Sequence, residues 1–417
     1  MALIIYNSFG FLFRLAFRFV ASWNEKAKKG LVGRRSQKIK FQNPNSEKTI
    51  WMHCASLGEF EQGRPVVEAL LKRYPSKKLI ISFFSASGHE AAKNYELAEQ
   101  IFYLPFDGKH SSSDFINHVN PEIVIWVKYE YWFWYLTILK ERKIPVLLVS
   151  AHFRHSQPFF KWYGGLYVEM LNSFTHVFVQ HPESLSLIKN ILPEKKLTIS
   201  GDTRFDRVLA LKENHEALPD FINEFVGDHL CIVAGSTWPE DELQIMHFEK
   251  ANPTIKFFIV PHEVDEASIK EVQRRFEKHI LYSELVEGKT LGTANNLMVV
   301  DKIGILSTLY QYADIAYIGG GFNESGIHNS LEAAVWGTAI VFGPVHEKFV
   351  EAKKLIELGA ANSISTPIEL EATLNEIIND QELLKNKKII SRDFVASNRG
   401  ATDKILDYIQ ENRLLIN

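Results

Sequence analysis

The stretch "TIWMHCASLGEFEQGRPVVEALLKRY", residues 49–74, contains the pattern on which the fold is built. Its first six residues are mostly apolar, as is typical of a strand that is covered on both faces in a parallel sheet. A turn of small residues follows, and Pro65 then opens a stretch with helical periodicity. Strand, turn and helix in this order form the first half of a βαβ unit. The acid Glu59 therefore falls at the carboxyl end of a strand, where open α/β sheets bind ligands.

The same unit recurs along the chain in two series. Strand-like runs of the first series are residues 49–54, 78–84, 100–106, 122–127, 145–151, 176–180 and 197–200. Those of the second series are residues 229–236, 255–260, 279–283, 296–300, 315–321, 339–343 and 359–365. A chain of 417 residues is too long for one compact core. We therefore expect two Rossmann-like α/β domains, residues 41–215 and 216–397, facing each other across a cleft.

The two ends of the chain differ from these domains. The first 22 residues contain ten Phe, Leu or Ile side chains and two arginines, and seven Lys or Arg follow between Lys26 and Lys40. An apolar helix followed by a basic segment suits a membrane surface with anionic headgroups, so residues 1–40 are expected to anchor the protein there. The alternatives are a helix packed on its own domain and a tilted membrane span. The stretch 398–417 is predicted to be a helix that crosses back to the first domain.

The composition limits the classes of function. Hydrophobic residues make up 46% of the chain and charged residues 23%, which describes a globular protein. The net charge of −3 gives no general reason to expect a nucleic-acid partner, so a basic binding surface has to be local. The two cysteines form no CxxC motif, and we expect neither a metal site nor a cofactor.

The stretch "YIGGGFNESGIHNSLEAAVWGTAIVFGP", residues 317–344, is the most suggestive of a ligand site. A strand ends in three glycines, and a second loop leads to a helix that Asn329 or Ser330 would cap. Glycines let backbone N–H groups approach a phosphate, and Glu332 in the first helical turn is placed to accept hydrogen bonds from a ribose. The alternative is a glycine-rich turn with an acid that compensates the helix dipole.

Other predicted strand ends also have polar side chains. Ser236 and Thr237 offer hydroxyl and N–H groups to an anion, although a plain helix start explains them equally well. His262 lies at another strand end, where a structural histidine is the usual alternative. Glu130 lies among aromatic residues, and for this acid the alternative is a buried pair with Lys128.

Several motifs together resemble a known family. In order and spacing, "SLGE", "YLPFD", "GDTRFD", "GSTWPEDE", "DKIGILSTLYQYADIAYIGGG", "GIHNSLE" and "VFGPVHEKF" are similar to those of the bacterial Kdo transferases of lipid A assembly. These enzymes, glycosyltransferase family 30, move 3-deoxy-D-manno-octulosonic acid (Kdo) from CMP-Kdo to a lipid A precursor. The resemblance covers nearly the whole chain. It implies the GT-B fold, a metal-free reaction, an acceptor-binding first domain and a donor-binding second domain.

The resemblance also implies roles for individual residues. Glu59 would be the catalytic base. The donor CMP-Kdo would be bound by Ser236, Thr237, His262, Gly320, Gly321, Gly326, His328, Asn329 and Glu332. The lipid acceptor would be bound by Ser56, Gly58, Arg64 and Glu130, with Lys28, Lys29, Arg34 and Arg35 docking its phosphates.

The chain departs from the family pattern at several of these motifs. The stretch "KYEYWFW", residues 128–134, keeps Glu130 where the family has two acids. Pro261 is followed by His262 and Glu263, where the family has an Arg-His pair. Trp238 stands where the family has a histidine. These changes are typical of a distant branch of the family rather than of a loss of activity, because the predicted base Glu59 and the predicted ribose contact Glu332 are retained.

The sequence therefore predicts an inverting, metal-independent Kdo transferase of lipopolysaccharide biosynthesis. It would act on the cytoplasmic face of the inner membrane, with CMP-Kdo and a lipid A precursor as substrates. The alternatives are another GT-B enzyme, either a lipid glycosyltransferase or a nucleotide-sugar epimerase, and a non-catalytic membrane-docked protein that binds a sugar nucleotide.

Overall fold

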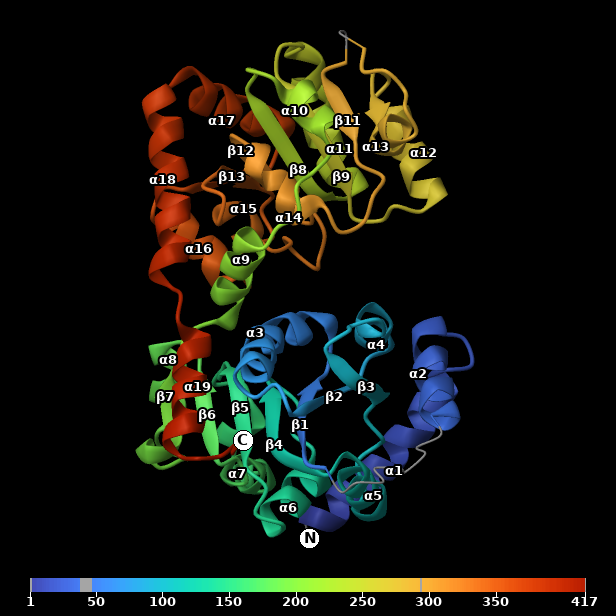
Figure 1. The fold of residues 1–417 in the computed structure, drawn as a ribbon, viewed down its shortest axis with the longest axis vertical. Coiled ribbons are helices and arrows are strands. Elements are labelled where there is room, and N and C mark those ends of the chain that lie inside the picture. The colour runs from blue at the N-terminus through green and yellow to red at the C-terminus, as the bar shows by residue number, and fades with distance from the viewer. Residues whose placement is uncertain (1, 38–46, 293–294, 417) are drawn as a thin grey trace. The chain divides into compact units, whose positions relative to one another are not determined.

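A computed structural model of the chain describes residues 2–37, 47–292 and 295–416 (Figure 1). Two parts of the sequence-based expectation lie outside these residues, namely the end of the basic segment at 38–40 and the start of the first domain at 41–46.

The chain forms two compact units. One consists of Met1–Arg207 together with Arg399–Asn417, and the other is Val208–Asn398. The division follows Arg207, eight residues before the expected boundary at residue 215. The first unit thus contains both chain ends, because its last helix returns to it.

The first unit is built on a parallel sheet of seven strands in the order β3-β2-β1-β4-β5-β6-β7. The strands are β1 Thr49–Cys54, β2 Lys78–Phe83, β3 Ala98–Tyr103, β4 Pro121–Val127, β5 Val146–Ala151, β6 His176–Val179 and β7 Leu197–Ile199. All six residues of β1 are buried, which explains why its sequence is apolar without alternation. The strand order reverses between β1 and β4, and open α/β sheets bind ligands at such a switch point.

Helices cover both faces of this sheet and enclose two apolar cores. They are α1 Ala2–Val20, α2 Glu25–Ser36, α3 Leu57–Arg73, α4 Ala86–Ala92, α5 Lys109–Val119, α6 Phe133–Glu141, α7 Gly165–Asn172, α8 Pro182–Ile188 and the final α19 Ala401–Glu411, with short 3₁₀ turns at Pro158–Phe160 and Glu194–Lys196. Asp206 accepts hydrogen bonds from the N–H groups of Gly400 and Thr402, at 2.6 and 2.7 Å, and so caps α19. Buried Ile405 and Ile409 then place α19 in the same core as β1.

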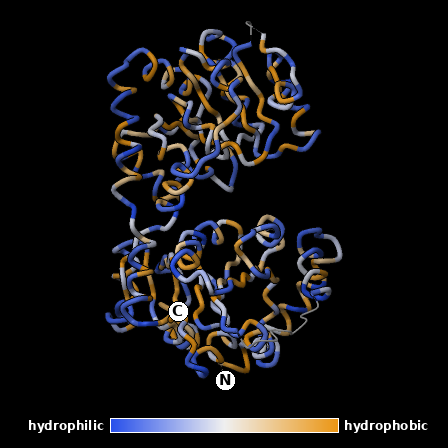
Figure 2. The backbone as a smooth tube through the Cα atoms, viewed as in Figure 1, coloured by the Kyte–Doolittle hydropathy of each residue, from blue (hydrophilic) through white to orange (hydrophobic). Residues whose placement is uncertain are grey.

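The second unit repeats the plan with a sheet in the order β10-β11-β9-β8-β12-β13-β14, also parallel. Its strands are β8 Cys231–Thr237, β9 Lys256–Pro261, β10 Ile280–Leu281, β11 Leu297–Val299, β12 Ile315–Ile318, β13 Ala339–Phe342 and β14 Ala361–Ser363. Its helices are α10 Asp220–Val226, α11 Pro239–Ala251, α12 Glu266–Arg275, α13 Tyr282–Val286, α14 Leu306–Leu309, α15 Leu331–Ala334, α16 Val350–Glu357, α17 Pro367–Asn379 and α18 Gln381–Ser397, with a 3₁₀ turn at Tyr310–Tyr312. The helix α9, Thr203–Glu213, begins in the first unit and ends in the second. Figure 2 shows hydrophobic residues gathered on the strands of each unit. Two doubly wound α/β units confirm the predicted fold class.

One helix begins earlier than the sequence analysis expected. Pro65 does not open α3 but lies inside it, and the helix starts at Leu57. The Ser56 hydroxyl accepts from the Glu59 N–H at 3.5 Å, and the Glu59 carboxylate accepts from the Ala55 N–H. A serine followed three residues later by a glutamate is a capping pattern, and it sets the helix start. Glu59 is therefore part of the first turn of α3 rather than of the loop before it.

The helix α1 packs on the first unit along one narrow stripe. Its partly buried positions, residues 6, 10, 13, 14 and 17, recur at the three- and four-residue spacing of one helix face. Phe13 and Phe17 contact the rings of Phe84 and Phe106. The remaining face is apolar and exposed. Among the described residues, α1 is the one helix whose length and composition would allow it to cross a membrane.

Candidate functional site

The carboxylate of Glu59 lies at the carboxyl end of β1, beside the switch point of the first sheet. Gly63, one turn further along α3, brings the helix close to the sheet, because a Cβ at this position would lie 2.4 Å from the sulfur of Met52. The Glu59 side chain is buried, with 7% of the residue exposed. Burial disfavours the charged form and raises the pKa of Glu59 to about 7, against the opposing effect of the hydrogen bond from the Ala55 N–H. A carboxylate that titrates near neutral pH suits proton transfer.

A second carboxylate, Glu130, lies near Glu59 and further raises its pKa. One oxygen of Glu130 accepts from the indole N–H of Trp132 at 3.0 Å and lies 2.8 Å from Nε2 of His53. His53 is fully buried in β1, and its other ring nitrogen lies 2.9 Å from the Ser82 hydroxyl. Glu130 is thus held by a hydrogen-bonded network in the switch-point region.

His53 is a member of this network that sequence reasoning missed. Its signal was a single ionisable side chain inside an otherwise apolar strand. His53 is also a partner of Glu130 that the sequence analysis, which considered Lys128, did not name. Lys128 itself follows β4 with a φ of 58°, in the left-handed region that non-glycine residues seldom occupy. Such strain is often found at functional sites.

Of the other residues expected to bind an acceptor, Ser56 and Arg64 have structural contacts of their own. Ser56 caps α3. The guanidinium of Arg64 donates to Glu68 at 2.9 Å and to Glu61 at 3.1 Å. Gly58 is exposed, and a Cβ there would meet open space. Around Glu59, the structure therefore brings together Ser56, Gly58 and Glu130, while Arg64 belongs to an ion-pair network on α3.

The four basic residues of α2 that were expected to dock the acceptor fall into two groups. Lys28, Lys29 and Arg35 are exposed. Arg34 is different, because its guanidinium donates to the carbonyls of Gly30, Phe84 and Leu104 and lies over four aromatic rings, 4.7 Å from that of Phe84. Burial lowers its pKa to about 10. Arg34 therefore fastens α2 to the rest of the first unit, whereas Lys28, Lys29 and Arg35 are exposed to solvent.

In the second unit, the three consecutive glycines after β12 allow close packing between loops. A Cβ at Gly321 would lie 2.5 Å from the backbone nitrogen of Gly343. Gly320 has a φ of 91°, and its N–H donates to Asp241 at 2.8 Å. The N–H of Gly326 donates to the side chain and carbonyl of Asn323. Two N–H groups expected to face a phosphate are therefore already donated within the protein.

Asp241 is the centre of this arrangement, and the sequence analysis did not single it out. In α11 it accepts from the N–H groups of Gly320 and Trp238, at 2.8 and 2.9 Å, and from the Tyr317 hydroxyl at 2.9 Å. The signal was an acid three residues after a helix start, which is the capping position. Thr237 is also engaged, because its buried hydroxyl donates to Glu242 at 3.1 Å.

Three aromatic side chains from separate loops stack against one another near these glycines. The ring of Trp238 lies 4.7 Å from that of His262, and the His262 ring lies 4.5 Å from that of His328. The indole N–H of Trp238 donates to Nε2 of His328 at 3.2 Å. Burial lowers the pKa of His328 to about 4, so this ring is neutral at neutral pH. The structure thus unites His262 and His328 and adds Trp238.

Glu332 is the second residue of the short helix α15, whose N-cap is Ser330. The amide nitrogen of Asn329 donates to Glu332 at 3.0 Å, while its carbonyl oxygen accepts from the Leu331 N–H at 3.2 Å. Asn329 therefore orients the carboxylate of Glu332. Among the described residues, no group of three or more His, Cys, Asp or Glu side chains is arranged to hold a metal ion.

Comparison with known proteins gives a match to a family and matches to individual relatives. Residues 29–207 match the family described as 3-deoxy-D-manno-octulosonic-acid transferase (kdotransferase). A bifunctional glycosyltransferase/methyltransferase of Fusobacterium nucleatum is 28% identical over 94% of this chain, which spans 59% of that relative's length. The 3-deoxy-D-manno-octulosonic acid transferase of Aquifex aeolicus is 27% identical over 82% of this chain and 89% of its own.

A solved structure shares the fold. The UDP-GlcNAc 2-epimerase of Neisseria meningitidis superposes with a TM-score of 0.62 at 16% identity, covering 88% of this chain and all of that one. At this identity the likeness concerns the fold alone.

Proposed function

We propose that this chain, a homologue of the Kdo transferases and a glycosyltransferase of the GT-B fold, transfers Kdo from CMP-Kdo to a phosphorylated lipid A precursor. The observation that carries the proposal is the buried carboxylate of Glu59, with its pKa raised to about 7, at the switch point of the first sheet. A general base has to be largely ionised at the working pH and still able to hold a proton, and such a pKa meets both needs.

In the proposed reaction, Glu59 takes the proton of an acceptor hydroxyl. The hydroxyl oxygen forms a new bond to the anomeric carbon of Kdo, and the bond from this carbon to the phosphate oxygen breaks. CMP leaves with the electron pair, and the anomeric configuration is inverted. Glu130, held by His53 and Trp132, lies near Glu59 and contributes to raising the pKa of Glu59.

We assign the donor to the second unit. Glu332, oriented by Asn329, is placed to accept hydrogen bonds from the ribose of CMP. His262 is exposed, and because its ring stacks with those of Trp238 and His328, we assign its ring edge to the donor. Because the N–H groups of Gly320 and Gly326 are internally donated, we assign the phosphate to the remaining groups of these loops, including Ser236, Gly321 and Asn329.

We assign the lipid and the membrane surface to the first unit. The exposed apolar face of α1 and the exposed cations Lys28, Lys29 and Arg35 of α2 combine the two features that hold a protein to an anionic membrane. The phosphates of a lipid A precursor have the charge that these cations would attract. These features support our assignment of the enzyme to the cytoplasmic face of the inner membrane.

The test is incubation of the purified chain with CMP-Kdo and a tetraacylated disaccharide bisphosphate lipid, followed by mass spectrometry. We expect a product that is heavier by one or more Kdo units, together with release of CMP. If CMP-Kdo is consumed only with a different lipid acceptor, the acceptor assignment is wrong. If CMP-Kdo is not bound and another sugar nucleotide is converted, the assignment as a Kdo transferase is wrong.

A further inference from the structure

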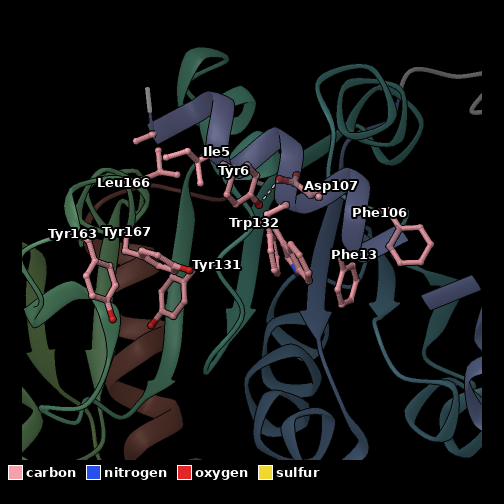
Figure 3. A pocket seen from close by; sticks show the side chains of 13 residues that line it. Ile5, Tyr6, Phe13, Phe106, Asp107, Tyr131, Trp132, Tyr163, Leu166 and Tyr167 are labelled. Carbon is pink, nitrogen blue, oxygen red and sulfur yellow. Dashed lines mark hydrogen bonds between the residues drawn. The ribbon is translucent and has the colours of Figure 1, made fainter. Parts of the chain in front are cut away.

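An apolar pocket of about 470 Å³ lies in the first unit, walled on one side by the N-terminal helix α1 (Figure 3). Its other walls are Phe106 and Asp107 after β3, the pair Tyr131 and Trp132 before α6, and the start of α7. Its volume is within the roughly 300–1,000 Å³ that is usual for small-molecule sites. Neither Glu59 nor Glu130 lines the pocket, although Trp132 contributes to both the pocket and the network of Glu130.

The chemistry of its walls favours an apolar ligand. Among the described lining residues, Asp107 carries the only charge. Its oxygens accept from the Tyr6 hydroxyl at 2.7 Å, the Ser112 hydroxyl at 3.0 Å, and the N–H groups of Trp134 and Tyr135 at 3.0 and 3.2 Å. The carboxylate is thus engaged in holding α1 against the unit, and aromatic and aliphatic surface remains for a ligand.

The position of the pocket indicates which apolar ligand it takes. Ile5 and Phe9 line it, yet they remain 63% and 60% exposed, so its wall continues onto the open apolar face of α1. At another wall, Trp132 donates to Glu130, whose charge acts on Glu59. The pocket therefore extends from a surface suited to a membrane toward the two carboxylates of the candidate site.

We propose that this pocket receives one fatty acyl chain of the lipid acceptor, which rests on the proposed function. A lipid held there would leave its acyl chain between α1 and α7 and present its polar headgroup toward Glu59. The exposed cations of α2 complement the phosphates of that headgroup. In this role α1 is a wall of the acceptor site in addition to a membrane contact, so it contributes to the choice of acceptor.

Gly10 offers a way to fill the pocket without disturbing the helix. It lines the pocket, and a Cβ at this position would meet nothing within 4 Å. Leu166 of α7 allows the pocket to be filled from the opposite wall. Ala16 is the matched control, because it is exposed on α1 and does not line the pocket. The three variants are Gly10→Trp, Leu166→Trp and Ala16→Trp.

The first measurement compares transfer to the tetraacylated disaccharide in detergent with transfer to the same disaccharide after its acyl chains have been removed. We expect Gly10→Trp and Leu166→Trp to lower kcat/KM at least tenfold for the acylated acceptor and to leave that for the deacylated one unchanged. Ala16→Trp should match the wild type on both. Equal activity of all variants on the acylated acceptor would overturn the inference, and unchanged transfer to the deacylated acceptor confirms that the first unit of each variant is folded.

A second measurement does not require transfer. The tetraacylated disaccharide, carrying a diazirine on one acyl chain, is photocrosslinked to the full chain, and the labelled peptides are mapped. We expect labels on residues 163–167 that Gly10→Trp removes and Ala16→Trp preserves, and their absence in the wild type would refute the pocket assignment. Labelling of these residues without any Kdo transfer would instead contradict the proposed reaction, while still supporting the assignment of the pocket as a lipid site.

Discussion

The two units of the molecule place an acid at the same point of the same topology, and the two acids have different surroundings. Glu59 is the third residue of α3, which follows β1, and Asp241 is the third residue of α11, which follows β8. In its sheet, β1 lies between β2 and β4, and β8 lies between β9 and β12 in the other. Each acid therefore follows the strand at the switch point of its sheet. Both carboxylates are buried, and burial raises the pKa of each.

The difference lies in the hydrogen bonds that each acid accepts. Asp241 accepts three, from two loop N–H groups and the Tyr317 hydroxyl, and so joins three segments of its unit. Glu59 accepts from the backbone N–H groups of Ala55 and Tyr129 but from no side chain that the structure describes around it, and it lies near a second carboxylate, Glu130. The same fold position therefore yields a structural acid in one unit and, in our proposal, a proton acceptor in the other.

The largest expected effect is on catalysis in the first unit. Glu59→Gln retains an oxygen that can accept from the Ala55 N–H but removes the group that takes the proton. We expect transfer to fall by roughly 10²- to 10⁴-fold, the usual contribution of a general base, with CMP affinity unchanged. Glu96→Gln, which removes an exposed carboxylate of the same unit, is the control. Near-normal turnover of Glu59→Gln would show that the two acids do not differ in the way proposed.

The next effect is on stability in the second unit. Asp241→Ala leaves the N–H groups of Gly320 and Trp238 and the Tyr317 hydroxyl without their acceptor. Leaving a buried donor unsatisfied costs about 1–3 kcal/mol, so the free energy of unfolding should fall by roughly 3 kcal/mol or more. Chemical denaturation followed by near-ultraviolet circular dichroism measures this change. If Glu59→Ala destabilised the protein as much, the contrast between the two acids would be lost.

A third effect concerns the pH dependence of Glu59. An acid whose pKa is raised on folding stabilises the protein at low pH, where both states hold the proton, and this stabilisation is lost as pH rises from about 4.5 to about 7. A shift of this size corresponds to about 3 kcal/mol. Glu59→Gln should therefore be as stable as the wild type at pH 4.5 and more stable at pH 8. Wild-type kcat/KM should rise with pH through about 7, because the base has to lose its proton.

Denaturation curves of the wild type and of Glu59→Gln, recorded between pH 4.5 and pH 8, measure the difference in stability. A pH–rate profile of the wild type measures the pH dependence of kcat/KM. A stability difference that does not change with pH would mean that the pKa of Glu59 is close to its ordinary value. A profile without an inflection near pH 7 would remove the main support for its role as a base.

The strands were predictable from the sequence because their signal is local. The central strands of the two sheets fall on apolar runs, as expected for strands covered on both faces, whereas the edge strands β3 and β14 include polar residues. The start of α3 was misplaced for a local reason as well, since Pro65 was given more weight than the capping pattern formed by Ser56 and Glu59. That pattern was present in the sequence and would have corrected the boundary.

The remaining features depend on contacts between distant residues. Arg34 belongs to a basic run in the sequence, yet carbonyl groups 50 and 70 residues away take its hydrogen bonds. His53 meets Glu130 across 77 residues, and Asp241 meets the N–H of Gly320 across 79. Periodicity predicts which face of an element is buried, but it does not predict which polar groups meet once the sheet has formed.

A smaller effect is expected at the ribose contact proposed in the second unit. Glu332→Ala removes a charged acceptor, and Asn329 alone cannot replace it. CMP affinity should fall by about 1.5–3 kcal/mol, the usual contribution of a hydrogen bond to a charged group. Isothermal titration measures it, and Glu324→Ala, at an exposed acid of the preceding loop, is the control. Equal affinities of the wild type and Glu332→Ala would exclude this contact and move nucleotide recognition to the stacked rings of His262 and His328.

The smallest expected effect is that of chelation. This experiment tests whether the carboxylates of Glu59 and Glu130, or that of Asp241, bind a metal ion. The oxygens of Asp241 accept from N–H and O–H groups, and one oxygen of Glu130 accepts from the Trp132 indole, so much of their capacity is already used. Phosphate charge can be met by backbone N–H groups and helix starts without a cation. We therefore expect transfer to continue at an unchanged rate after dialysis against excess EDTA. A loss that Mg²⁺ restores in the wild type would assign the carboxylates of Glu59 and Glu130 a metal-binding role, and the raised pKa of Glu59 would then no longer describe the active enzyme.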